Sequence, residues 1–337
     1  MSKTSVSKKT AGKIGLIGSI SLIIATVVGV GVFFKNGSVF NNNHHNAIGV
    51  LISWILAIVI ALFTAFSFAE IVTVKGLRNP NAGLAGWSEK MVGYNFGRHV
   101  SLTQSTFYYP AKFVAMATFA AVAIFQVYFT AVSNNPNDMQ FHAGLLGIDD
   151  RYTTLIVMGV AIGLIAIFMT ANLLSNKFGG VVSKGATFVK FVPIIMIILI
   201  GIIFGALLGG GLWNKQAINP GTLDPEPLPI IEGGIKYSGE LDVGGIFRSI
   251  PAILFAFDSF LVIGNVHNQV RDPDKNVPLA IVISMICACS AEVLVTVGEI
   301  TIGTGNPYTV MWIGLNGTKW AYILCVCIIS VSIVIAA

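Results

Sequence analysis

The feature that most constrains this chain is a series of long apolar segments that recurs along nearly its whole length. A helix needs about 20 apolar residues to cross a hydrocarbon core about 30 Å thick. Windows of this kind are 14–34, 48–69, 101–132, 153–174, 184–208, 244–264, 278–304 and the stretch from 321 onward. They predict an all-α polytopic membrane protein with seven complete spans and an eighth that is cut short at the end of the chain.

The composition excludes the common soluble classes. Charged residues make up 10% of the 337 residues, whereas a soluble domain typically carries about 25%. So few charges cannot cover a water-facing surface of this size, which excludes a soluble enzyme, a disordered chain and a nucleic-acid-binding protein. No spacing of Cys or His typical of a metal site is present, so neither a metal nor a cofactor is expected.

The distribution of Lys and Arg predicts the orientation. The tail 1–13 carries four lysines, and the segments on its side of the membrane hold twelve of the 20 Lys and Arg residues. Cytoplasmic loops are enriched in these residues. We therefore expect a multi-pass protein of the cell membrane with a cytoplasmic N-terminus. Residues 14–337 then form one transmembrane domain, in which the Pro-rich loop 209–243 is extracellular.

Two spans contain residues that oppose an unbroken, inert helix. Gly29 and Gly31 lie midway along the first span, where each glycine costs about 1 kcal/mol relative to alanine, although small residues also serve close helix packing. Asp258 lies at the centre of the sixth span, where insertion of an acid costs about 3 kcal/mol. Together they favour two broken helices, whose free backbone N–H and C=O groups suit a zwitterion such as an amino acid.

Three motifs carry a resemblance to a known family. They are GVGVF at 29–33, NPNAGLAGW at 79–87, and FAFDSF at 255–260, which VRDPDKNVPLAI follows at 270–281. In this order they resemble the amino acid–polyamine–organocation superfamily of permeases. The resemblance implies the inverted five-plus-five repeat transporter fold with broken helices one and six, and it implies that the C-terminal helices of that fold are missing from this chain.

The resemblance also implies a substrate site between the two breaks. Val28, Gly29, Val30 and Gly31 would face the substrate carboxylate, and Phe255, Ala256 and Asp258 would face its amino group. Phe255 and Phe257 are candidate aromatic gates over this site. The alternative for both rings is packing against lipid or the protein core.

Four charged residues inside the spans are candidates for coupling transport to an ion, namely Asp258, Lys112, Glu292 and Lys190. The first three lie near the midplane, where an unpaired charge is costly, so each is expected to be paired or neutral. Asp258 would contact the substrate or take up a proton; the alternative is an interhelical ion pair with Lys112. By resemblance Lys190 would replace a coupling sodium ion; otherwise it snorkels to the interface. Glu299 is expected to be solvated near the outer surface.

The predicted function is a secondary active transporter that moves amino acids across the cell membrane by alternating access. Its partners would be the amino acid and the lipid bilayer, and the mode stays open between exchange and symport with a proton or a sodium ion. The alternative is a non-transporting nutrient sensor or interaction protein on the same scaffold. A membrane-embedded enzyme is disfavoured, because the sequence has neither the G-x-G-D run of an intramembrane aspartyl protease nor an H-E-x-x-H motif.

Overall fold

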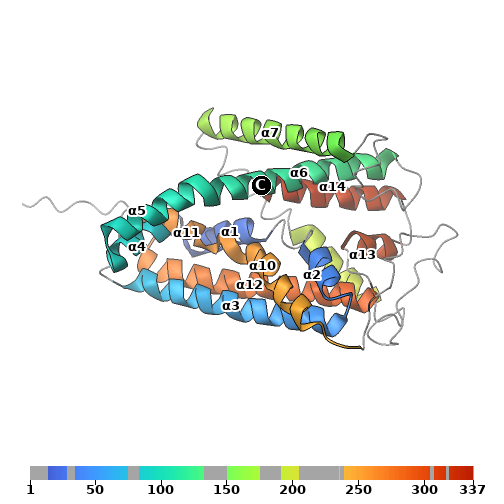
Figure 1. The fold of residues 1–337 in the computed structure, drawn as a ribbon, viewed down its shortest axis with the longest axis horizontal. Helices are drawn as coiled ribbons and strands as arrows, with labels where there is room; N and C mark the ends of the chain where they lie inside the picture. Colours follow the sequence, from blue (N-terminus) through green and yellow to red (C-terminus); the bar gives the residue numbers. More distant parts are fainter. Residues whose placement is uncertain are drawn as a thin grey trace, which may run out of the picture.

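A computed structural model describes residues 14–28, 35–74, 83–132, 150–174, 191–204, 235, 239–303, 307–315 and 319–336. Within these residues every regular secondary-structure element is a helix, and the one isolated β-bridge pairs Ile14 with Val270. The predicted all-α class is therefore confirmed. Most of the long helices run along one common axis (Figure 1).

The helices are α1 (Leu16–Val27), α2 (Asn36–Asn42), α3 (Ala47–Thr73), α4 (Leu84–Val92), α5 (Tyr94–Thr103), α6 (Tyr109–Val132), α7 (Asp150–Leu174), α10 (Val243–Phe257), α11 (Val262–Asn265), α12 (Pro273–Ile302), α13 (Pro307–Gly314) and α14 (Lys319–Ala336). Short segments of tighter or wider winding lie beside them: the π-helical η3 (Gln104–Tyr108) and η6 (Ile200–Phe204), and the 3₁₀ turns η8 (Asp258–Leu261) and η9 (His267–Gln269).

Five stretches of the described helices are long and apolar enough to cross a membrane. They are Ala47–Thr73, Tyr94–Phe125, Tyr152–Thr170, Val243–Asn265 and Pro273–Ile302. These stretches overlap the predicted second, third, fourth, sixth and seventh spans, and the shorter apolar helices Leu16–Val27 and Phe191–Ile203 overlap the first and fifth. The predicted polytopic membrane protein is thereby confirmed.

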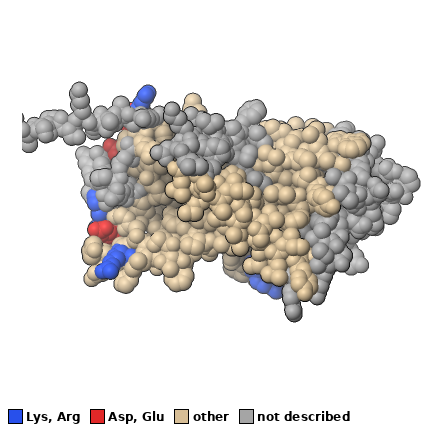
Figure 2. Space-filling model, turned by 90° about the horizontal axis from the view of Figure 1, so that it is seen from above, with Lys and Arg blue, Asp and Glu red and all other residues tan. Residues whose placement is uncertain are grey.

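The packing of α3 shows how the sequence places one helix face inward and the other toward lipid. Ala57, Ala61, Ala65 and Ala69 recur at every fourth residue, so they share one face, and all four are buried. Small side chains let α3 approach α12 and α10 closely. Phe63, by contrast, is 69% exposed, as suits a ring in contact with lipid. Most of the visible described surface likewise carries no charged side chain (Figure 2).

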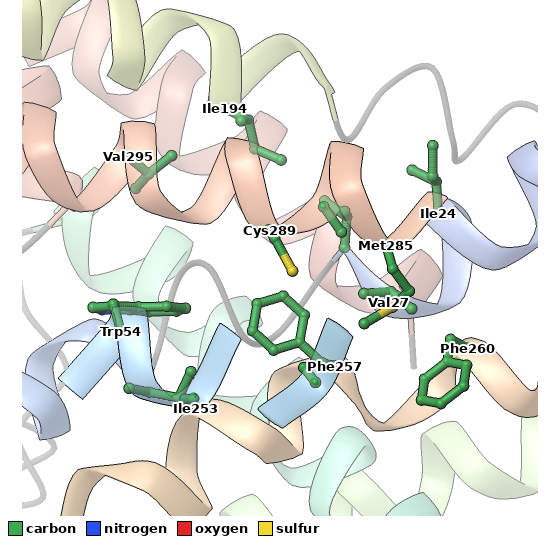
Figure 3. Packing of buried hydrophobic residues seen from close by; sticks show 14 of the residues in the cluster. Ile24, Val27, Trp54, Ile194, Ile253, Phe257, Phe260, Met285, Cys289 and Val295 are labelled. Carbon is green, nitrogen blue, oxygen red and sulfur yellow. The ribbon is translucent and has the colours of Figure 1, made fainter. Parts of the chain in front are cut away.

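The hydrophobic core lies where α1, α3, α10 and α12 meet. Figure 3 shows Phe257 of α10 among Val27, Trp54, Met285 and Cys289, which come from the other three helices. The rings of Phe257 and Trp54 meet edge to face, with centroids 6.2 Å apart. This core fixes the central part of α10, and so it also fixes the position of Asp258, which follows it directly.

Helices α6, α14 and α7 form a separate layer along one side of this core (Figure 1). Helix α14 packs along α6, and the Ser330 hydroxyl donates to the Ala123 carbonyl at 2.9 Å. Helix α7 packs against α6 through a small cluster that contains Ala117, Ala121, Val157 and Ala161. Helix α6 is therefore contacted within this layer by both α14 and α7.

Candidate substrate site

The first predicted break begins where α1 ends. Val28 leaves the helix with extended backbone angles, φ −80° and ψ 112°, while its N–H still donates to the Ile24 carbonyl at 2.9 Å. Its side chain is buried. The next helix of the described chain, α2, begins at Asn36. Gly29, Val30 and Gly31 lie outside the described residues, so their role in binding a carboxylate stays a prediction.

The sixth span changes its winding at the FAFDSF motif. Helix α10 ends at Phe257, the 3₁₀ turn η8 runs from Asp258 to Leu261, and α11 resumes α-helical winding at Val262. The chain thus stays helical through 256–259, and the feature is a tightened turn instead of an unwound segment. A tightened turn frees fewer backbone groups than an unwound one, so recognition at this point depends more on side chains.

Asp258 joins three polar side chains at this turn. The Tyr108 hydroxyl donates to the Asp258 carboxylate, and the Lys112 ammonium lies 3.3 Å from the same oxygen, Oδ2. Lys112 also donates to the Ser259 hydroxyl at 2.5 Å. Tyr108 and Lys112 are four residues apart and therefore project from one helix face. The interhelical ion pair that the sequence left as an alternative is present in the structure.

A cavity of about 690 Å³ opens beside this Asp258 cluster, which consists of Asp258, Ser259, Tyr108 and Lys112. The cluster forms part of its wall, and Thr26 near the end of α1 forms another part. Small-molecule sites commonly have volumes of about 300 to 1,000 Å³, so an amino acid fits easily. Neither Phe255, Ala256 nor Phe257 is among the residues that line the cavity.

The three residues before Asp258 do not line the cavity. Ala256 and Phe257 are buried in the core. The ring of Phe255 instead meets the ammonium of Lys35, whose Nζ lies 4.8 Å from that ring centroid and 5.2 Å from the centroid of Phe119 on α6. Both distances are within the range of a cation–π contact. No local pattern indicates this contact, because Lys35 directly follows the apolar window 14–34 in the sequence.

Glu292 belongs to a different part of the molecule from the Asp258 cluster. It is completely buried on α12, and so is Glu299, seven residues further along. The expectation that Glu299 is solvated is therefore wrong: residues of α2, η6 and α13 pack over this end of α12. Asn36 of α2 lies between the two acids and Trp54 of α3. Lys190, the remaining coupling candidate, lies outside the described residues.

Described parts of the second and third motifs lie at the end of the bundle that contains α4. Trp87 packs against Phe68, with ring centroids 5.9 Å apart, and Phe68 packs against Phe260 of η8 at 5.8 Å. The backbone of Ile14, ahead of α1, pairs with Gln269 at 3.0 Å and with Arg271 at 2.8 Å. Segments from spans one, two, six and seven are thus tied together beside the turn that holds Asp258.

A second acidic contact of the sixth span lies at the opposite end of the bundle from α4. Asp242 precedes α10, and its carboxylate lies 3.0 Å from Arg248 Nη2 and 3.3 Å from His44 Nε2. The backbone N–H of Gly245, together with these two basic side chains, holds the pKa of the Asp242 carboxyl below its ordinary value. This carboxylate is therefore ionised at neutral pH and anchors the start of α10.

Comparison with known proteins identifies the family. Residues 14–337 match the model of the amino acid permease family. The chain is 24% identical over 312 residues to the serine/threonine exchanger SteT of Bacillus subtilis, which covers 92% of this chain and 59% of that protein. It is 26% identical over 300 residues to the b(0,+)-type amino acid transporter 1 of Homo sapiens, which covers 87% of this chain and 52% of that protein.

A similar match extends to an uncharacterized protein of Mycoplasma pneumoniae, with 27% identity over 293 residues, 83% of this chain and 48% of that protein. The chain spans about half the length of the curated relatives that it matches. The family model, by contrast, matches the chain from Ile14 to its last residue. The chain therefore belongs to the amino acid permease family of the amino acid–polyamine–organocation superfamily.

Proposed function

We propose that the protein is a secondary active transporter that moves amino acids across the cell membrane by alternating access. The observation that carries this proposal is the Asp258 cluster, a set of charged and polar side chains on the wall of a cavity within apolar helices. Ionisable residues inside membrane spans face pathways or bound substrates by default, since their insertion is costly. The relatives named above are an exchanger and an amino acid transporter.

In this proposal the substrate ammonium group binds at Asp258. It would compete with the Lys112 ammonium, which now occupies the same carboxylate oxygen. The substrate carboxylate would then bind at Gly29, Val30 and Gly31, the residues that follow Val28. Lys112 belongs to α6 and Asp258 to η8, so replacement of the Lys112 ammonium by the substrate ammonium removes a contact between these two elements. Conformations with and without this contact would then differ in their affinity for substrate.

Phe255 has a second role in this proposal. With Phe119 it holds the Lys35 ammonium across the gap between α10 and α6. Lys35 stands just before α2 and just after the predicted break in span one. Movement of this lysine away from the two rings would release a contact between α10 and α6, so we assign Phe255 to a gate, while Phe257 supports the core. The transport mode is exchange or symport with a proton or a cation, and the N-terminus is cytoplasmic.

Uptake of a labelled amino acid mixture by proteoliposomes that contain the purified protein tests the proposal. Asp258→Asn keeps the side-chain shape and removes the charge, so uptake should be abolished or lose its coupling. Asp242→Asn is the matched control, because the same chemical change is made at the exposed end of the same span, and it should leave uptake near the parent value.

The alternative function would show itself in the same experiment. Specific binding of amino acids without flux, in vesicles whose protein is folded and correctly inserted, would favour a nutrient sensor. Wild-type affinity and pH dependence of uptake in Asp258→Asn would contradict the role given to Asp258.

A further inference from the structure

Two carboxyl groups on α12 are buried without visible compensation. Glu292, Thr296 and Glu299 follow one another at intervals of four and three residues, so they lie on one helix face. Both glutamates have 0% exposure, and none of their four carboxyl oxygens has a hydrogen-bond partner among the described residues. The Thr296 hydroxyl between them donates to the Glu292 carbonyl at 2.9 Å.

A buried amide faces the same place from another helix. Asn36 at the start of α2 has no exposed surface, and its Oδ1 accepts from Trp54 Nε1 at 3.1 Å and from Thr296 Oγ1 at 3.3 Å. Its amide group faces the Glu299 carboxyl. Within the described chain, however, its Nδ2 makes no hydrogen bond of ordinary geometry. Polar groups that lack hydrogen-bond partners in the described chain therefore face one buried region from two helices.

The charge state of this pair follows from its surroundings. An ionised carboxylate in an apolar interior costs many times more than a neutral acid unless a cation faces it, and a second carboxylate nearby raises that cost. Cys289 lies one turn from Glu292 on α12 and interacts with it, and α13, which packs against α12, carries the buried Tyr308. Lys35, which adjoins Asn36, directs its ammonium to Phe255 and Phe119.

Among the described elements, the other helices that pack against α12 bring no balancing charge to this end. Helix α1 and the segment η6 contain no titratable side chain. The one titratable group of α3, Glu70, lies near the end of that helix opposite Trp54. Asp258 of η8 is paired with Lys112, and His267 of η9 lies near the start of α12. The pair is therefore stable in this arrangement when its acids are protonated.

We propose that Glu292 and Glu299 form a buried proton-binding site that is separate from the Asp258 cluster and is linked by Asn36 to the start of α2. Loss of a proton would place a negative charge beside Asn36 and would require water or a cation to enter. Helix α2 would have to move to admit either one. Proton occupancy would thus bias the position of α2, which follows the predicted break in span one.

Protonation of this pair does not depend on the proposed function, but its coupling to uptake does. Infrared difference spectroscopy of the purified protein measures the first property directly, through the C=O stretching band of a protonated carboxyl group. We expect this band in the parent protein at neutral pH and a reduced band in both Glu292→Gln and Glu299→Gln. Glutamine matches the shape of the neutral acid, so both variants should fold. Glu70→Gln, at an exposed site, should leave the band unchanged.

The outcomes separate the two proposals. Absence of the band in the parent protein, or equal bands in the parent and both buried-site variants, would overturn the proton site whether or not the variants transport. Loss of this band when sodium is added at constant pH would also overturn the proton site, in favour of a cation site. Where the parent protein transports, Glu292→Gln should abolish the pH dependence of uptake and the substrate-driven proton movement reported by a trapped dye. Retention of both signals would refute the coupling.

Discussion

The two acidic regions of the bundle differ in what surrounds each carboxyl group. Asp258 is 29% exposed at its side chain, lies beside a cavity, and is contacted by Lys112 and Tyr108. Glu292 and Glu299 have no exposed surface, and their carboxyl oxygens have no hydrogen-bond partner within the described residues. One region therefore stabilises a charge, whereas the other stabilises a neutral acid.

The difference shows how one apolar bundle holds acids for two tasks. A carboxylate with a movable lysine partner can exchange that partner for a substrate ammonium group, because both cations satisfy the same charge. A carboxyl group sealed among helices can exchange only a small particle, and a proton is the smallest. The comparison predicts that changes in the Asp258 cluster alter charge balance and substrate binding, while changes around Glu299 act through packing and water access.

The largest effect should come from leaving one charge of the Asp258–Lys112 pair alone. Lys112→Met is expected to abolish uptake and to lower the free energy of unfolding by about 1 to 3 kcal/mol, less than for a fully buried pair because both side chains are partly exposed. Lys112→Met combined with Asp258→Leu should recover the stability without recovering uptake. Thermal unfolding in detergent, followed beside the uptake assay, measures both. A double variant no more stable than either single variant would contradict the ion pair.

The second prediction concerns the packing that keeps Glu299 dry. A Cβ at Gly201 of η6 would lie 2.5 Å from Gly298 Cα, a backbone atom that cannot move aside easily. Gly201→Ala should push η6 from α12 and cost about 1 to 3 kcal/mol, the usual range for overpacking. Gly159→Ala on α7 is the control, since a Cβ there meets nothing within 4 Å. Thermal unfolding that is equal in the two variants would show that the helices adjust.

The same two regions show what the sequence could predict. The length of the apolar windows determined most spans, and counting residues from the window ends placed Asp258 and Lys112 at similar depth, which made their pairing one of two alternatives. The same counting failed for Glu299. It lies near the end of its span, but α2, η6 and α13 cover it, and such cover depends on contacts between segments far apart in the chain.

Other features of the site were beyond local sequence patterns for related reasons. The FAFDSF motif indicated an interruption, yet the residues around Phe257 pack into the core tightly enough to keep the chain helical as a 3₁₀ turn. Lys35 follows the apolar window 14–34 and belongs to no motif. Its contact with Phe119 and Phe255 depends on the positions of α6 and α10 relative to each other, which no periodicity within one helix specifies.

The smallest effect should come from a third carboxyl group, Asp242, which extends the comparison to a site near water. Its pKa is lowered by the Gly245 N–H and by Arg248 and His44. A lowered folded-state pKa means that the stability from this group is fully present above the unfolded pKa, about 4, and is lost as the pH falls through the lower folded value. Melting temperatures of parent and Asp242→Asn should therefore converge only in acid, below about pH 4. If the melting temperatures of the two proteins instead differ by a constant amount down to the most acidic pH, Asp242 does not stabilise α10 through its charge. The contrast among carboxyl environments would then rest on the Asp258 cluster and the Glu292–Glu299 pair alone.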